Sequence, residues 1–202
     1  MIFRLRAHQT WPLAFLIAAA VVSFVWLDLP LARWTAGNIG RMNALGTGLA
    51  SPILLSIEAA TALTLIVVRL ARGHLSRWNE AVALASLTSI CAYAVNENVL
   101  KLIFGVPNPQ SVLMGASHAL HLMAGGPTSS FPSGHMVLAS AFAGVLMNLQ
   151  PRIAWPLWAL LAFGILLLVW GDWHFASDAF AGTFAGLAAG FLAGEVWQAH
   201  AD

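Results

Sequence analysis

The sequence predicts an all-α membrane protein, in which residues 1–202 form a single domain, a bundle of six transmembrane helices. Of the 202 residues, 59% are hydrophobic and only 8% are Asp, Glu, Lys or Arg, whereas soluble domains carry about 25% charged residues. Several apolar runs are long enough to cross a bilayer. The lipid bilayer is therefore the expected partner, and a net charge of +1 gives no indication of nucleic-acid binding. Because Cys91 is the one cysteine, a disulfide framework is excluded.

Each predicted span is an apolar run bounded by Pro, Gly or charged residues. The expected spans are Trp11–Leu29, Pro52–Leu70, Ala81–Phe104, 134–150, Ile153–Trp170 and Phe175–Trp197. The first run is too long for the apolar region of a signal peptide, so we expect a retained helix although Arg4 and Arg6 precede it. The connection Pro30–Ala50 is expected to be a loop. The longest polar stretch, Gly105–Ser133, joins the third and fourth spans and is expected to contain a short helix at Ser111–Met123.

Lys and Arg residues in the connections predict the orientation, because they favour the cytoplasmic side of a membrane. With the N-terminus inside, the inner side holds Arg4, Arg6, Arg69, Arg72, Arg77 and Arg152, and the outer side holds Arg33, Arg41 and Lys101. We therefore expect both termini in the cytoplasm, as in a bacterial inner or plasma membrane. The Gly105–Ser133 stretch and the Gly171–Asp172 turn would then share the extracytoplasmic face, where they can build one site.

The fourth span begins with a sequence that favours anion binding, Phe131-Pro132-Ser133-Gly134-His135. Ser133 is a suitable N-cap residue. The first backbone N–H groups of a helix have no intrahelical acceptor and attract phosphate. Gly134 would allow a close approach, and His135 would be placed to pass a proton to a bound oxyanion. Without partners elsewhere in the chain, the same residues describe an ordinary capped helix.

Two further pairs of charged residues, each four apart, stand at the outer ends of spans. His174 and Asp178 open the sixth span, where a carboxylate bonded to one ring nitrogen would make the other a more basic nucleophile. Ionisable residues so close to hydrocarbon are functional by default, and a polar pair that caps the helix is the alternative. Glu97 and Lys101 end the third span, and taken alone they are best explained as a snorkelling lysine with its helical ion-pair partner.

Two other patterns have structural interpretations. Small residues at four-residue spacing let helices approach closely, and we expect this packing role for Gly182, Gly186, Gly190 and Gly194. His118 and His121 are three residues apart in the expected loop helix. Because no carboxylate or cysteine accompanies them, a surface pair is favoured over a metal site. We expect neither a metal nor a cofactor.

Three stretches together resemble the type 2 phosphatidic acid phosphatase (PAP2) superfamily of membrane lipid phosphatases. The pattern of that family is K-x6-R-P, then P-S-G-H, then S-R-x5-H-x3-D. Lys101 takes the place of the first lysine, and Pro132–His135 matches the second motif in full. His174 and Asp178 match the end of the third motif. The order and intervals fit from Lys101 to the end of the chain.

The resemblance implies a phosphohistidine mechanism on a membrane lipid substrate. His174 would attack phosphorus and Asp178 would orient its ring. His135 would protonate the leaving oxygen and then activate the incoming water or alcohol. The implied substrate-binding residues are Lys101, Ser133, Gly134 and Asn108. The scheme requires no metal, and the sequence carries no signal for an oligomeric state.

The chain departs from the family at both arginines that grip the phosphate, where it has Asn108 and Leu168. A branch similar to sphingomyelin synthases keeps two histidines and an aspartate without those arginines and transfers a headgroup between lipids. A lipid phosphodiester transferase or hydrolase is therefore slightly favoured. The alternatives are an ordinary phosphatase of phosphatidate or isoprenoid phosphate, with Arg33 or Arg41 restoring the lost charge, and a non-catalytic lipid-binding relative. The intact histidines and aspartate argue against the last.

Overall fold

The computed structural model describes residues 7–42, 50–126 and 129–201, and Arg4 and Arg6 lie outside this range. Within it the secondary structure is helical, apart from one isolated β-bridge between Pro107 and Ser129. The helices are α1 (Ala7–Val22), η1 (Ser23–Leu27), α2 (Asp28–Asn38), α4 (Ala50–Arg72), α5 (Arg77–Val95), η2 (Asn96–Leu100), α6 (Lys101–Phe104), α7 (Pro109–Leu113), α8 (Gly134–Leu149), η3 (Pro151–Ile153), α9 (Ala154–Trp170) and α10 (Ala176–Ala201). The prediction of an all-α fold is confirmed for the described residues.

Four of the helical segments in the described residues are long and apolar enough to cross a membrane. They are Gln9–Asn38, Ala50–Arg72, Pro151–Trp170 and Ala176–His200. The helix α8 is apolar but shorter, and the third expected span corresponds to α5 with its continuation through η2 and α6. Four spans are thus supported by length and composition, and the count of six stays a prediction.

The expected bounds of the first helix and of the loop helix were wrong. The first helix contains a π-helical turn, η1, and continues beyond Leu29 to Asn38. Pro30 lies in the first turn of α2, directly after the π-helical turn. The loop helix expected at Ser111–Met123 is instead the short α7, which Asn108 caps and which ends before Gly115, a residue with φ of 110°.

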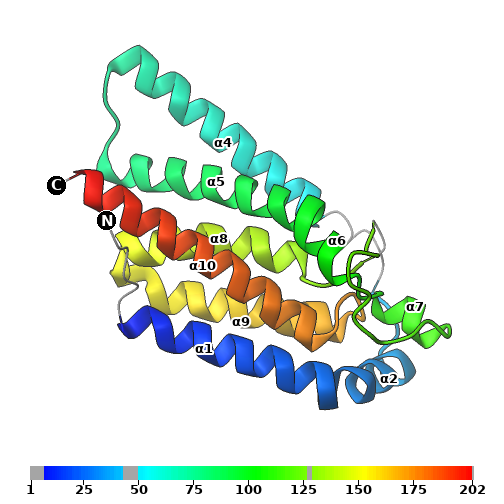
Figure 1. Ribbon diagram of the computed structural model, residues 1–202. Helices are drawn as coiled ribbons and strands as arrows, with labels where there is room; N and C mark the ends of the chain where they lie inside the picture. Colours follow the sequence, from blue (N-terminus) through cyan, green and yellow to red (C-terminus); the bar gives the residue numbers. More distant parts are fainter. Residues whose placement is uncertain (1–6, 43–49, 127–128, 202) are drawn as a thin grey trace.

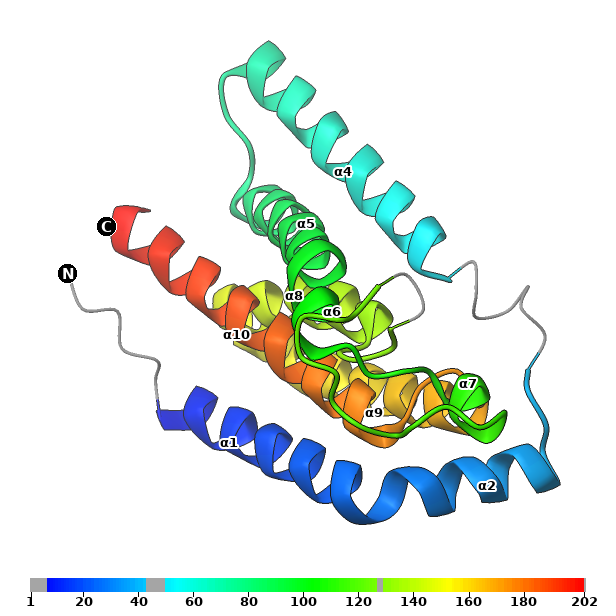
Figure 2. The same ribbon diagram turned by 45° about the vertical axis from the view of Figure 1, so that its right-hand side comes forward.

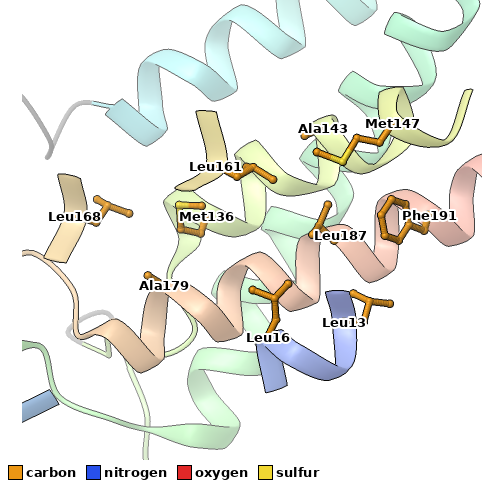
Figure 3. Packing of buried hydrophobic residues seen from close by; sticks show 10 residues of the cluster. All are labelled: Leu13, Leu16, Met136, Ala143, Met147, Leu161, Leu168, Ala179, Leu187 and Phe191. Atoms are coloured by element: carbon orange, nitrogen blue, oxygen red, sulfur yellow. The ribbon is translucent and has the colours of Figure 1, made fainter. Parts of the chain in front are cut away.

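The helices lie side by side, with α10 in the centre of the bundle and α4 at its edge beside α5 (Figures 1 and 2). Buried side chains of α1, α8, α9 and α10 form the largest apolar cluster (Figure 3). Its members are Leu13, Leu16, Met136, Ala143, Met147, Leu161, Leu168, Ala179, Leu187 and Phe191. The starts of α8 and α10 lie at the same end of the bundle as α6 and α7, opposite the start of α1 and the end of α10 (Figure 1).

Glycines of α10 allow this helix to lie directly against α8. A Cβ atom built at Gly182 would lie 2.5 Å from the carbonyl oxygen of Ser133, and one at Gly190 would lie 2.5 Å from that of Ala141. A Cβ at Gly186 would meet Ser140 Oγ and the carbonyl oxygen of Val137, the latter at 2.5 Å. These distances are far below van der Waals contact, so no larger residue fits without separating the helices. The packing role expected for these glycines is confirmed.

We predict that Gly186→Ala destabilises the protein, because the added methyl group must push α10 away from backbone atoms of α8. Overpacking of this kind costs about 1–3 kcal/mol. The matched control is Gly37→Ala in α2, where a Cβ meets nothing within 4 Å. Replacing a helical glycine by alanine in open space stabilises by up to about 1 kcal/mol. Thermal unfolding of both variants in one detergent measures the difference, and equal melting temperatures would contradict the close contact.

Candidate active site

The start of α8 presents a buried polar cap with an unused hydroxyl group. Ser133 occupies the N-cap position with φ of −63° and ψ of 117°, and its carbonyl accepts the N–H of Val137 at 3.0 Å. Its own N–H donates to the carbonyl of Asp178 at 3.0 Å. Ser133 Oγ is buried and has no hydrogen-bond partner among the described residues. Ser133 therefore caps α8 by position but not through its side chain, and its hydroxyl and the first N–H groups of α8 can serve a ligand.

His174 and Asp178 lie at the start of α10, but not as a pair on one helix face. The helix begins at Ala176, so His174 precedes it, which corrects the expected start at Phe175. The carbonyl of Phe175 accepts the N–H of Ala179, and Asp178 Oδ2 accepts the N–H of Phe175 at 2.9 Å. The carboxylate of Asp178 thus reaches back to the helix start, as an acidic third residue does in a capping box.

The same carboxylate faces the ring of His174. The distance from His174 Nδ1 to Asp178 Oδ2 is 3.4 Å, and both side chains are largely buried, with exposed fractions of 10% and 0%. Nδ1 makes no hydrogen bond within the described part of the chain, and such contacts often tighten when charge develops during a reaction. The hydrogen bond from the N–H of Phe175 fixes the Asp178 carboxylate. The carboxylate can therefore orient the ring of His174.

His135 and His174 face each other across the contact between α8 and α10. Their ring centroids are 5.6 Å apart and their planes make an angle of 73°. His135 is half-buried in the first turn of α8, next to the buried Gly134. Of the predicted site residues, the structure therefore brings together Ser133, Gly134, His135, His174 and Asp178.

Glu97 and Lys101 form an ion pair that lies beside this cluster. Lys101 Nζ is 2.7 Å from Glu97 Oε1 and 2.9 Å from Oε2. A Cβ atom at Gly134 would lie 2.5 Å from Glu97 Oε1, so the pair borders the first turn of α8. The buried Asn96 fastens it there, because its Nδ2 donates to Glu97 Oε1 and to the carbonyl of Pro132, both at 3.2 Å. The local ion pair expected from the sequence is confirmed.

Asn108 has a structural contact of its own. Its Oδ1 accepts the N–H of Ser111 at 2.9 Å and so caps α7. The side-chain oxygen of Asn108 therefore bonds within the loop, and this contact does not involve the two histidines. Substrate binding by Asn108 stays a prediction.

Arg41 lies on the residue that precedes His174. Its guanidinium carbon is 4.4 Å from the ring centroid of Trp173, and the N–H of Met42 donates to the carbonyl of Gly171 at 3.2 Å. Burial raises the pKa of the Asp172 carboxyl above its ordinary value, and the nearby Arg41 partly offsets this. Arg33, in contrast, borders a separate pocket with His118 and Phe24. Of the two outer arginines considered from the sequence, Arg41 is the one that contacts the turn before His174.

The sequence reasoning missed a buried cluster behind α10. Asp28 is only 1% exposed and accepts the N–H of Ser177 at 3.0 Å and the Nε2 of His118 at 3.2 Å. His118 was expected in a surface pair, and this was wrong, since its side chain is 7% exposed while His121 is exposed. An acidic residue inside the first apolar run was the available signal, because such residues rarely face lipid.

Within the described part of the chain, no group of three or more His, Cys, Asp or Glu side chains has the arrangement of a metal site. The fold and site define a helical membrane protein with two histidines and a buried carboxylate at the starts of two adjacent helices. The model of the PAP2 superfamily matches residues 81–201, and the chain belongs to this superfamily. Comparisons with curated proteins and with solved structures gave no match. The family match includes Lys101, His135, His174 and Asp178, whereas Asp28 and Arg41 lie outside it.

Proposed function

We propose that this protein is a membrane enzyme that cleaves or transfers the phosphoryl group or phospho-headgroup of a lipid, with His174 as nucleophile. Membership of the PAP2 superfamily indicates a phosphatase- or phosphotransferase-type function. The main structural support is that the rings of His135 and His174 lie next to each other. The carboxylate of Asp178 faces Nδ1 of His174. A nucleophile oriented by a carboxylate, opposite a second acid or base, is an arrangement suited to covalent catalysis.

The roles of the two histidines follow from which ring nitrogen of His174 faces the Asp178 carboxylate. Asp178 faces Nδ1 of His174, which leaves Nε2 for attack on phosphorus. In the first step the bond from Nε2 to phosphorus forms, the bond from phosphorus to the leaving oxygen breaks, and His135 gives that oxygen a proton. In the second step His135 takes a proton from water or an alcohol, whose oxygen then displaces Nε2 from phosphorus. Asp178 stabilises the positive charge on His174 throughout.

The start of α8 would bind the non-bridging oxygens of the phosphate. Its first N–H groups have no intrahelical acceptor, and the buried Ser133 Oγ is without a partner among the described residues. Lys101 lies beside the same turn through its pair with Glu97. Donors that are fixed before the reaction stabilise developing negative charge without reorganisation.

We predict that His174→Ala abolishes both turnover and the trapped phosphohistidine. His135→Ala should still form the covalent intermediate slowly from a lipid with a good leaving group, because only the proton donor is lost. Asp178→Asn should lose much of the rate, since a carboxylate that orients a catalytic histidine can contribute about 10⁴-fold. Rapid quenching followed by mass spectrometry of the whole protein and of its peptides measures the intermediate and the residue that carries it. Accumulation of a phospho-enzyme in His174→Ala would show that the roles are misassigned.

The charge of the site supports a phosphodiester as the preferred substrate. A phosphomonoester carries a charge of about −1.5 to −2 at neutral pH, whereas a diester carries a single negative charge. Lys101 is paired with Glu97, and Asn108 and Leu168 stand where the family has arginines. Since a neutral amide or a leucine cannot replace a bidentate cation, a monoanion suits this site better.

A phosphomonoester is the second candidate, and the position of Arg41 favours it. The guanidinium group lies on Trp173, one residue from His174, although Arg41 comes from the stretch that follows the first helical segment. Stacking on an aromatic ring leaves the N–H groups of an arginine available to a phosphate. Arg41 would then supply in space the charge that is missing in the family motifs.

A comparison of kcat/KM for matched monoester and diester lipids in one detergent decides between the two. We predict faster turnover of the diester and little effect of Arg41→Ala on it. If the monoester is turned over faster, and Arg41→Ala abolishes this preference while Arg33→Ala does not, then Arg41 replaces the family arginines. Arg33, in α2, is the matched control because it is also an exposed arginine and lies only eight positions before Arg41 in the sequence.

We further propose that the single domain has both termini in the cytoplasm and its site at the extracytoplasmic face. The six-to-three distribution of Lys and Arg supports this orientation. The site would then act on lipids of the outer leaflet.

The orientation predicts opposite labelling of two exposed positions. In a Cys91→Ala background, Ser117→Cys in the long loop should react with an impermeant thiol reagent on intact cells. His74→Cys, in the connection between α4 and α5, should react only after lysis. Both residues are exposed, so access depends on the side of the membrane. The reverse pattern would invert the topology.

A further inference from the structure

We infer that Asp28 and His118 form a positioning pair that fixes the start of α10, and through it the ring of His174. Neither residue belongs to the reacting groups of the proposed mechanism. Asp28 also lies outside the part of the chain that matches the family model. The catalytic consequence of this inference rests on the proposed function, whereas the anchoring itself does not.

The start of α10 needs acceptors from elsewhere in the chain. Phe175 is its N-cap residue by hydrogen bonding, but a phenylalanine side chain has no oxygen to cap the first N–H groups. Asp178 accepts the N–H of Phe175, and Asp28 Oδ1 accepts the N–H of Ser177 at 3.0 Å. Asp28 Oδ2 also accepts the hydroxyl of Ser177. Asp28 therefore caps α10 from another helix.

His118 provides a further hydrogen-bond contact to the Asp28 carboxylate. Its Nε2 lies 3.2 Å from Asp28 Oδ2, and because a carboxylate only accepts, this nitrogen carries the proton. The ring lies between those of Phe24 and Phe175, at centroid distances of 4.7 Å and 4.6 Å. His118 thus joins the loop after α7 to the first helical segment and to the residue that follows His174.

A π-helical turn directs Asp28 inward. The buried positions of this segment are Gln9, Leu13, Leu16 and Ala20 in α1, Ser23 at the start of the turn, and Asp28, Ala32 and Thr35 after it. The step from Ser23 to Asp28 is one residue longer than the α-helical pattern allows. An unbroken α-helix would have buried Leu27, which is instead 44% exposed. The extra residue of η1 turns the following helix by about 100°, and such turns are frequent at functional sites.

A buried carboxylate is costly unless it is bonded, and Asp28 meets this condition through the N–H and hydroxyl of Ser177 and the ring of His118. Asp28 and Ser177 are 1% and 0% exposed, and their bonds fix Ser177, which adjoins Asp178. The carbonyl of Asp178 in turn accepts the N–H of Ser133. Movement of the α10 start would therefore displace His174 relative to His135, and a displacement of about 1 Å can cost 100-fold in rate.

The test compares Asp28→Asn, His118→Phe and Ser177→Ala with the control Thr35→Val. Asp28→Asn keeps the shape but loses an acceptor, and His118→Phe keeps the ring stacking but loses the hydrogen bond. Thr35 is equally buried on the same helix face, and the bonds of its hydroxyl to the described residues go to carbonyls of its own helix, those of Leu31 and Ala32. Two measurements are made on each full-length variant: kcat and KM, and hydrogen exchange of the backbone amides at 174–178.

We expect Asp28→Asn to lower kcat by about 10- to 100-fold with KM nearly unchanged, since positioning acts on the reacting geometry. Exchange at 174–178 should become faster in Asp28→Asn, and to a smaller extent in His118→Phe and Ser177→Ala. Thr35→Val should change neither measurement. If Asp28→Asn does not fold, the two milder variants decide the question.

Unchanged exchange at 174–178, or a kcat that falls no further than in Thr35→Val, would overturn the inference. A rise in KM at constant kcat would also overturn it, because it would indicate a role in binding. Wild-type protein without turnover on any phospholipid would instead overturn the proposed function, and the exchange measurement alone would then decide the anchoring.

Discussion

The hydrogen bond from the N–H of Ser133 to the carbonyl of Asp178 joins the starts of two helices, and the rest of the site depends on it. It forms only because the glycines of α10 let that helix lie against the backbone of α8. The contact brings His135 and His174 from separate segments to face each other. Close helix packing and the arrangement of the candidate catalytic groups therefore have the same physical origin.

Much of this could be predicted from the sequence because it depends on short spacings. The Pro132–His135 motif and the spacing from His174 to Asp178 each span at most five residues, and the α10 glycines recur every four residues along one helix. The membrane class followed from composition, and the family resemblance was confirmed over residues 81–201. Residues a few positions apart have nearly fixed relative positions in a helix or turn. Predictions based on such spacings therefore hold even when the expected helix boundaries are off by a few residues.

The parts that could not be predicted depend on contacts distant in sequence or on one irregular turn. Asp28 meets Ser177 across 149 positions, and no spacing rule connects them. Arg41 reaches Trp173 only because the first helical segment continues to Asn38. His174 lies before α10 rather than in it, because Asp178 bonds the N–H of Phe175 and starts the helix one residue later than expected.

The π-helical turn at Ser23–Leu27 determines how the first helical segment responds to a change in its length. Losing one residue of the turn would leave Asp28 four residues after Ser23, so an unbroken α-helix would still direct the carboxylate inward. Gaining one residue would instead rotate everything beyond the turn by about 100°, and Asp28 would then face hydrocarbon, where a carboxylate is costly. Single deletions in the turn should therefore be better tolerated than single insertions, even though the segment lies outside the family match.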